Sequence, residues 1–251
     1  MNDDLLSVRV VLLSRWANDR GLLRQAAAMA KLPIEIDEAD NVAAVRRALA
    51  DRADLMFLDA ALPAAELAQA VSLAQAAAKP PFTVLLTAAA TAGGPVTTDA
   101  VAAKPTRLEE ARRLVERSVR VRIPSRFLIV DDSSTMRSVV RKILAATRFP
   151  FAVTEAAEGF AAIKLAGETD FDLVFLDYNM PGFSGLETLS ELKREKRRMS
   201  VVVMTSMQDG ALAERARAAG AAFLTKPFFP ADIEAILTRH YGFASLNPKR
   251  A

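Results

Sequence analysis

Three aspartates and a lysine in the second half of the chain are the side chains best suited to chemistry. Asp131 and Asp132 follow one short apolar run, Asp177 and Thr205 end two others, and Lys226 follows a fourth. Carboxylates that lie close together raise each other's pKa unless a cation lies between them. Oxygen ligands without histidine or cysteine favour a hard ion, and a site that keeps waters suits Mg²⁺. These residues therefore predict a magnesium site.

The same residues could transfer a phosphoryl group. Lys226 adds a second positive charge, and Thr205 adds a neutral hydrogen-bond donor. A metal ion and a lysine together neutralise phosphoryl oxygens, and a carboxylate held in line with the phosphorus is a nucleophile. We therefore expect phosphoryl transfer to one of the carboxylates.

Short apolar runs alternate with longer amphipathic stretches through this half. Residues 127–130 are continuously apolar, whereas in residues 135–146 the apolar positions recur with the period of a helix. Such alternation predicts a parallel sheet covered by helices on both faces, with the polar side chains gathered at the carboxyl ends of its strands. The other expected strands are 151–155, 173–176, 201–204 and 222–224, and the other expected helices are 159–166, 185–197, 211–219 and 231–241.

The first half repeats this pattern, with expected strands at 8–13, 34–38, 55–58, 83–86 and 101–103. Matching residues occur in the same order in both halves, at strand ends: DLMFLD at 54–59 with DLVFLD at 172–177, Thr87 with Thr205, and Lys104-Pro105 with Lys226-Pro227. Ordered matches of this kind indicate a duplication. We expect two domains, at 1–122 and 126–243, joined by a short linker at 123–125 and followed by a tail at 244–251.

Four segments of the second half carry a family resemblance: LIVDDSSTMR at 128–137, VFLDYNMPGFSG at 174–185, VVVMTS at 201–206 and FLTKPF at 223–228. Residues 126–241 resemble the receiver domain of a two-component response regulator, closest to the chemotaxis-type single-domain regulators. The resemblance implies two flavodoxin-like (βα)5 receiver domains, each an α/β fold with a five-stranded parallel sheet. It further implies a phosphoprotein of phosphorelay signal transduction.

The resemblance also implies the metal site and the phosphoacceptor. Asp177 would accept the phosphoryl group. Asp132 and Asp177 would bind Mg²⁺ (or Mn²⁺) directly, together with the backbone carbonyl of Asn179, and Asp131 would act through a water.

The remaining family residues would respond to the phosphoryl group. Lys226 would pair with its oxygens and precede Pro227 in a cis peptide bond, a feature of tight turns. Thr205 would move inward to donate a hydrogen bond. Phe223 stands at the family's aromatic switch position.

Each role has a structural alternative. Asp131-Asp132 could cap a helix, although Ser133 or Ser134 already suits that role. Phe223 could be an ordinary core residue, an alternative as well supported as the switch. His240 is expected to be a surface residue.

The first half appears as a degraded copy of this site, because Ser14-Arg15 replaces the paired aspartates. Arg15 could pair directly with Asp59, where the metal ion would otherwise lie. Asp59, Thr87 and Lys104 remain, so the site keeps its shape but should bind no metal. We expect a pseudo-receiver without a cofactor, and phosphorylation of Asp59 stays open.

The first half also has a shorter segment between its last two strands. The stretch from Thr87 to Lys104 contains the helix-breaking run Thr91-Ala92-Gly93-Gly94-Pro95. Its fourth helix should be shortened or absent, which would uncover apolar surface. We expect that face to dock against the second domain or a partner.

Composition excludes several other classes of protein. The chain has 251 residues, no cysteine and a net charge of +3, so thiolate metal sites and disulfides are excluded. Its acidic N-terminus and lack of a long apolar run predict a cytoplasmic protein without a membrane span. The basic run at 193–198 should be a solvated helix end, so we expect no nucleic-acid binding.

The leading prediction is a response regulator that receives its phosphoryl group from a sensor histidine kinase or a phosphotransfer protein. Its output would be binding to an unknown protein target, or homodimerisation, and not an enzyme activity on another substrate. One alternative is a phosphate sink or relay that drains a kinase. Another is the receiver portion of a longer regulator whose effector is missing, and a third, less favoured because no D-x-D motif follows the first strand, is an aspartate-nucleophile phosphatase.

Overall fold

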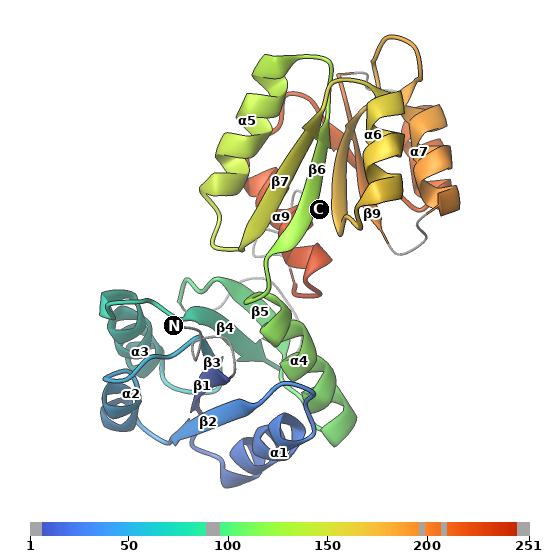
Figure 1. Cartoon of the computed structure of the whole chain (residues 1–251). Helices are drawn as coiled ribbons and strands as arrows, with labels where there is room; N and C mark the ends of the chain where they lie inside the picture. The colour runs from blue at the N-terminus through green and yellow to red at the C-terminus, as the bar shows by residue number, and fades with distance from the viewer. Residues whose placement is uncertain (1–6, 89–95, 196–198, 207–209, 245–251) are drawn as a thin grey trace, which may run out of the picture. The chain divides into compact units, whose positions relative to one another are not determined.

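A computed structural model describes residues 7–88, 96–195, 199–206 and 210–244. The chain forms two compact units, which are described separately (Figure 1): unit 1 is residues 1–122 with 237–251, and unit 2 is residues 123–236. The run Thr91–Pro95, the expected helix end at 196–197 and the tail beyond residue 244 lie outside the described residues. No helix among the described residues is both long and apolar enough to cross a membrane.

Unit 1 is built on a parallel sheet of strand order β2-β1-β3-β4-β5 (Figure 1). Its elements in chain order are β1 (Val8–Leu13), α1 (Ala17–Ala28), β2 (Ile34–Ala39), α2 (Val42–Ala48), β3 (Leu55–Asp59), α3 (Ala64–Ala76), β4 (Phe82–Thr87), β5 (Ala100–Ala103) and α4 (Leu108–Arg120).

Unit 2 has the same topology, with strand order β10-β9-β8-β6-β7. Its elements are β6 (Ser125–Val130), α5 (Ser134–Ala145), β7 (Phe151–Ala156), α6 (Gly159–Glu168), β8 (Leu173–Asp177), α7 (Gly185–Glu195), β9 (Ser200–Thr205), α8 (Gly210–Ala218), β10 (Ala222–Thr225) and α9 (Pro230–His240). Each unit therefore has the predicted five-stranded, flavodoxin-like architecture.

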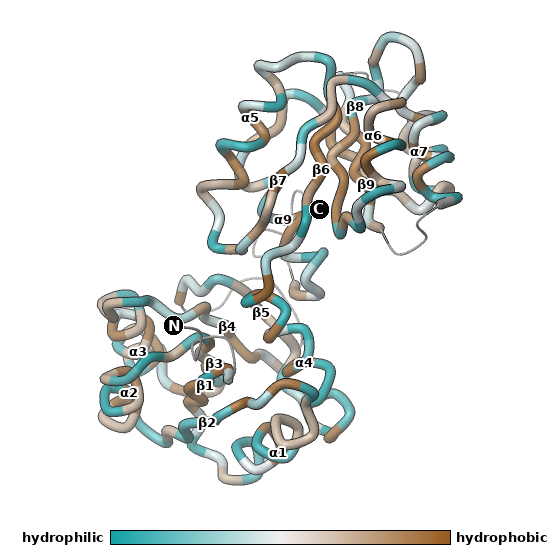
Figure 2. Tube along the Cα trace, viewed as in Figure 1, coloured by the Kyte–Doolittle hydropathy of each residue, from teal (hydrophilic) through white to brown (hydrophobic). Residues whose placement is uncertain are grey.

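The central strands explain why this fold forms. Every residue of β3 and of β8 is buried, which requires that helices cover both faces of each sheet. Figure 2 shows the strands as the hydrophobic centre of each unit, with hydrophilic residues concentrated on the helices and loops. Because the strands of each sheet are parallel, the polar residues that follow them lie at one edge of the sheet.

The two units share their backbone register at that edge. In each, the residue after the third strand donates to the fourth strand, and the lysine after the fifth strand donates to the threonine that ends the fourth. These bonds are Ala60 N to Leu86 O (2.9 Å) and Lys104 N to Thr87 O (2.8 Å) in unit 1, and Tyr178 N to Met204 O (2.8 Å) and Lys226 N to Thr205 O (2.7 Å) in unit 2. The internal repeat is therefore structural as well as sequential.

One feature of the described residues agrees with the expected organisation, and one differs from it. Between β4 and β5, none of the described residues is helical, whereas unit 2 has α8 between β9 and β10. Residues 237–243, which we expected within the second domain, are grouped with unit 1, so that the last turn of α9 belongs to it.

Candidate functional site

The acidic residues of unit 2 meet at the carboxyl edge of its sheet. Asp131 follows β6 directly, Asp177 is the last residue of β8, and these two strands are neighbours. Carboxylate oxygens of Asp131, Asp132 and Asp177 all lie within 4.8 Å of one another. Asp131 and Asp177 are buried, whereas Asp132 is exposed. A partly open set of three oxygen donors fits a hard divalent cation that keeps waters.

Lys226 joins two of these carboxylates. Its Nζ donates to Asp131 Oδ2 at 2.8 Å and to Asp177 Oδ1 at 2.9 Å. Burial alone lowers the pKa of an ammonium group, but these two bonds outweigh it and raise the pKa of Lys226 above its usual value. Lys226 therefore remains a cation beside Asp131 and Asp177.

Asp177 is in an environment that favours its neutral form. Burial raises the pKa of its carboxyl above the usual value, and the nearby charge of Asp131 adds to the increase. Lys226 and the backbone N–H of Asn179 hydrogen-bond to the carboxylate and oppose the increase. A further cation beside Asp177 would favour the ionised form, which is the nucleophilic one.

The other predicted residues lie around this centre. Thr205 is fully buried at the end of β9, and its backbone oxygen accepts the bond from Lys226 N. Lys226-Pro227 is a cis peptide, as the resemblance implied. Phe223 is partly buried on the edge strand β10 and packs against the core cluster of unit 2. The position suits either a switch or a core residue, and both alternatives stay open.

The loop after β6 is held by a cap and by an arginine. Ser133 Oγ accepts from Met136 N at 3.3 Å as the N-cap of α5, so the aspartates are not needed as caps. Arg137 donates to the backbone oxygen of Asp131 at 2.8 Å and to Glu155 at 2.9 Å. The same brace recurs in unit 1, where Arg20 donates to Ser14 O (2.6 Å) and Glu38 (3.1 Å). Sequence reasoning missed this brace, although both arginines lie at equivalent positions of the repeat.

Gly185 is a second residue that sequence reasoning missed. A Cβ at this position would lie 2.6 Å from the backbone oxygen of Asp177 and 2.6 Å from Tyr178 Cα. The loop that follows Asp177 can close back on β8 only because residue 185 has no side chain. The run GFSG, read as a family motif, contained this signal.

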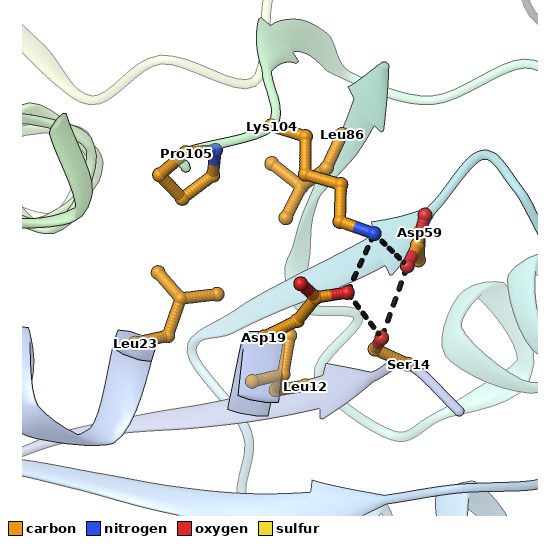
Figure 3. A pocket seen from close by; sticks show the side chains of 8 residues that line it. All are labelled: Leu12, Ser14, Asp19, Leu23, Asp59, Leu86, Lys104 and Pro105. Carbon is orange, nitrogen blue, oxygen red and sulfur yellow. Dashed lines mark hydrogen bonds and ion pairs between the residues drawn. The ribbon is translucent and has the colours of Figure 1, made fainter. Parts of the chain in front are cut away.

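In unit 1, a lysine pairs with two carboxylates at the carboxyl edge of the sheet. Lys104 Nζ lies 2.7 Å from Asp59 Oδ2 and 2.5 Å from Asp19 Oδ2 (Figure 3). Ser14 Oγ donates to Asp59 Oδ2 at 3.0 Å. Burial tends to lower the pKa of Lys104, but the bonds to Asp19 and Asp59 raise it overall. The site therefore carries its own cation.

The predicted ion pair between Arg15 and Asp59 is wrong. Arg15 pairs with Glu66 of α3 at the solvent-exposed surface. The side chain of its neighbour Ser14 is buried toward Asp59, so Arg15 points away from the site. The charge that neutralises Asp59 comes from Lys104 instead, and Asp19 of α1 supplies a second carboxylate that the sequence did not reveal.

Two cavities border this group. The one that reaches Asp59 has a volume of about 10 Å³, which holds about one water, and is lined by Leu12, Ser14, Asp19, Leu23, Asp59, Leu86, Lys104 and Pro105 (Figure 3). A second, more open cavity of about 580 Å³ is lined by Asn18, Asp19, Leu22, Ala88, Lys104, Pro105 and Thr106, and Asp59 is not among its lining residues. Thr87, the remaining predicted residue, ends β4, and its hydroxyl donates to Ala102 O at 3.4 Å.

Comparison with known proteins gives a consistent result. The response regulator receiver domain model matches residues 127–238. Over 112 residues the chain is 33% identical to chemotaxis protein CheY-3 of Vibrio cholerae serotype O1 (strain ATCC 39541 / Classical Ogawa 395 / O395), covering 43% of this chain and 85% of CheY-3. Over 82 residues it is 40% identical to nitrate/nitrite response regulator protein NarP of Escherichia coli (strain K12), covering 33% of this chain and 38% of NarP.

A solved structure extends the likeness beyond unit 2. A probable two-component system response regulator/GGDEF domain protein has a TM-score of 0.58 and 23% identity, and the match covers 93% of this chain and 97% of that one. This likeness concerns the fold alone. The chain spans well under half of NarP but most of CheY-3.

Proposed function

Since the chain belongs to the response regulator receiver family, we propose that it is a phosphorelay response regulator that is phosphorylated on Asp177. The observation that carries this proposal is the group of three carboxylates within 4.8 Å of one another, two of them bridged by Lys226. Ordinary structural roles do not require a buried acidic cluster at a strand edge.

In the proposed reaction, a carboxylate oxygen of Asp177 attacks the phosphorus of a phosphohistidine. The bond between phosphorus and the donor nitrogen breaks, and its electron pair stays with the imidazole. Lys226, already 2.9 Å from the attacking carboxylate, would hold the phosphoryl oxygens and offset their charge. Thr205, buried at the end of the neighbouring strand, would supply a neutral donor to the same oxygens.

The acidic residues of unit 2 would hold Mg²⁺ or Mn²⁺. Asp132 and Asp177, with the backbone carbonyl of Asn179, are proposed as direct ligands, and Asp131 as a ligand through water. The ion would supply charge neutralisation for the transferred group. Arg137 orients the loop that carries two of these aspartates by bonding to Asp131 O.

Unit 1 is proposed as a pseudo-receiver that binds no metal and accepts no phosphoryl group. Support comes from Lys104, which pairs with Asp59 and Asp19, and from the cavity at Asp59, whose volume of about 10 Å³ holds about one water. The carboxylate of Asp59 is still a nucleophile by its chemistry, but it is only 1% exposed.

The partners follow from the chemistry of the site. The phosphoryl donor is proposed to be a sensor histidine kinase or a phosphotransfer protein, and this chain is proposed to be cytoplasmic. The output is proposed to be a protein contact or a homodimer, with no catalysis beyond the protein's own phosphorylation and dephosphorylation.

Acetyl phosphate with Mg²⁺, followed by intact mass, tests the proposal. The wild type and Asp59→Asn should each gain one phosphoryl group, and Asp177→Asn should gain none. Two added groups on the wild type would overturn the inactive role of unit 1. No addition to the wild type, or addition to Asp177→Asn at the wild-type level, would overturn the role of Asp177.

A further inference from the structure

The sheet of unit 1 ends at the edge strand β5, and the described residues include no helix between β4 and β5. Even so, Val101 and its neighbours in β5 are buried. Phe82, the first residue of β4, is buried as well. Apolar residues at an open edge need a cover, because unpaired backbone groups and apolar surface both favour association with another chain.

The C-terminal segment of unit 1 supplies that cover. Ala244 N donates to Val101 O at 2.9 Å and forms an antiparallel bridge with it. The ring of Phe243 is 6.1 Å from that of Phe82, and Phe243 is only 6% exposed. Ala244 also packs against the core cluster that α2 and α3 cover. We call residues 241–244 the strap.

A charged residue of α4 holds the strap from its other side. Arg117 Nη1 donates to Gly242 O at 3.0 Å, and its guanidinium lies 5.7 Å from the centre of the Phe243 ring. Backbone bond, aromatic contact and arginine contact together fix three successive residues of the strap. A segment held by so many specific contacts is part of the folded unit rather than a loose tail.

The strap is joined rigidly to α9. Gly242 N donates to Arg239 O and Phe243 N to Thr238 O, both at 2.9 Å, and Gly242 has φ +80°. This pair of bonds is the Schellman closure of a helix, for which glycine in the left-handed region is suited. The start of α9, at Pro230, lies four residues after Lys226, so one continuous helix connects the proposed phosphoryl site to the strap.

From these contacts we propose that the strap occupies the edge of unit 1 and is released when Asp177 is phosphorylated. The proposed release, but not the proposed occupation of the edge, rests on the proposed function of Asp177. A phosphoryl group would draw Lys226 away from Asp131 and displace the start of α9. Because helix and strap form one rigid piece, the displacement would break the bond from Ala244 to Val101. Release would expose β5 and Phe82 as a site for an extended segment of another protein.

Amide exchange of Ala244, followed by NMR on the full chain, tests both halves of the proposal. In the unphosphorylated protein this amide should exchange slowly, and Phe243→Ala should make it exchange faster. The matched control is Phe160→Ala, because Phe160 is 65% exposed on α6 and should leave the exchange of Ala244 unchanged. Treatment with acetyl phosphate and Mg²⁺ should speed exchange about fivefold or more, at the low end of usual coupling between sites.

The results that overturn the proposal are distinct. Exchange of Ala244 at the rate of an unstructured peptide in the unphosphorylated wild type would show that there is no strap. Protection that disappears on dilution would assign the occupant to a second copy of the chain. Unchanged exchange, with one phosphoryl group confirmed by intact mass, would refute the release while leaving the proposed function intact. No phosphoryl group by mass would refute the proposed function, and the comparison with Phe243→Ala would still decide whether the strap exists.

Discussion

Lys104 Nζ lies 2.7 Å from Asp59 Oδ2 at the carboxyl edge of unit 1. Lys226 makes the equivalent contact with Asp177 in unit 2 at 2.9 Å. The two units thus share the lysine–aspartate pair but differ in what surrounds it. In unit 2 one lysine lies beside three carboxylates, whereas in unit 1 one lysine lies between two carboxylates and pairs with both.

Removing Lys104 should destabilise unit 1. Lys104→Ala leaves the buried Asp59 without its cation, and such a loss costs about 3 kcal/mol of unfolding free energy. Arg15→Ala is the matched control, since its ion pair with Glu66 is solvent-exposed and contributes at most about 1 kcal/mol. Urea unfolding measures both. Equal midpoints for the two variants would show that the Lys104 group does not stabilise the unit.

The raised pKa of Asp177 predicts that the folding stability of the protein depends on pH. The folded state binds a proton at this carboxyl more readily than the unfolded state, so stability falls as pH rises from the usual aspartate pKa through the raised value. Asp177→Asn remains neutral, and without Mg²⁺ it should melt roughly a few degrees higher than the wild type at neutral pH.

The difference in melting temperature between the wild type and Asp177→Asn should disappear under two conditions. Below about pH 4 both residues are neutral, so the melting temperatures should converge. Addition of Mg²⁺ at neutral pH should raise the melting temperature of the wild type but not that of Asp177→Asn. A wild type that is the more stable protein at neutral pH without Mg²⁺ would contradict the assignment of a raised pKa to Asp177.

Gly185 should tolerate no side chain. In Gly185→Ala the new methyl group would collide with the backbone of Asp177, and overpacking of this kind costs about 1–3 kcal/mol. The displaced backbone should also slow phosphorylation by acetyl phosphate. Gly167→Ala is the control, because nothing lies within 4 Å of that position in α6, and alanine there should add up to about 1 kcal/mol. Similar unfolding free energies for the two variants would refute the close approach.

The arginine brace should tune metal affinity without touching the metal. Arg137→Ala removes the donor to Asp131 O, and loss of such an orienting partner weakens metal binding about 10- to 100-fold. Arg141→Ala is the control, because Arg141 also pairs with Glu155, at 3.7 Å, but does so at an exposed position. Calorimetric titration with Mg²⁺ should show weaker binding for Arg137→Ala than for Arg141→Ala. If both variants bound Mg²⁺ as the wild type does, Arg137 would have no positioning role.

Much of this architecture could be predicted because the signals are local. The fully apolar runs that became β3 and β8 could only be buried strands, and the polar residues that follow such strands had to meet at one edge. The resemblance added the roles of Asp177 and Lys226.

The features that were missed depend on contacts between distant parts of the chain. Asp19 appears in the sequence as an ordinary acidic residue in the first turn of a helix, and only the folded sheet brings it to Lys104. Arg15 was placed wrongly because sequence position does not give the direction of a long side chain. The strap was missed because Phe243 reaches Phe82 from the other end of the chain.

The central claim is that Asp177, and not Asp59, accepts the phosphoryl group, and mapping the modified residue tests it most directly. Borohydride reduction after treatment with acetyl phosphate and Mg²⁺ converts an aspartyl phosphate to homoserine, which tandem mass spectrometry locates. Homoserine at position 177 alone is the predicted result. Homoserine at position 59, or at neither position, would contradict the account.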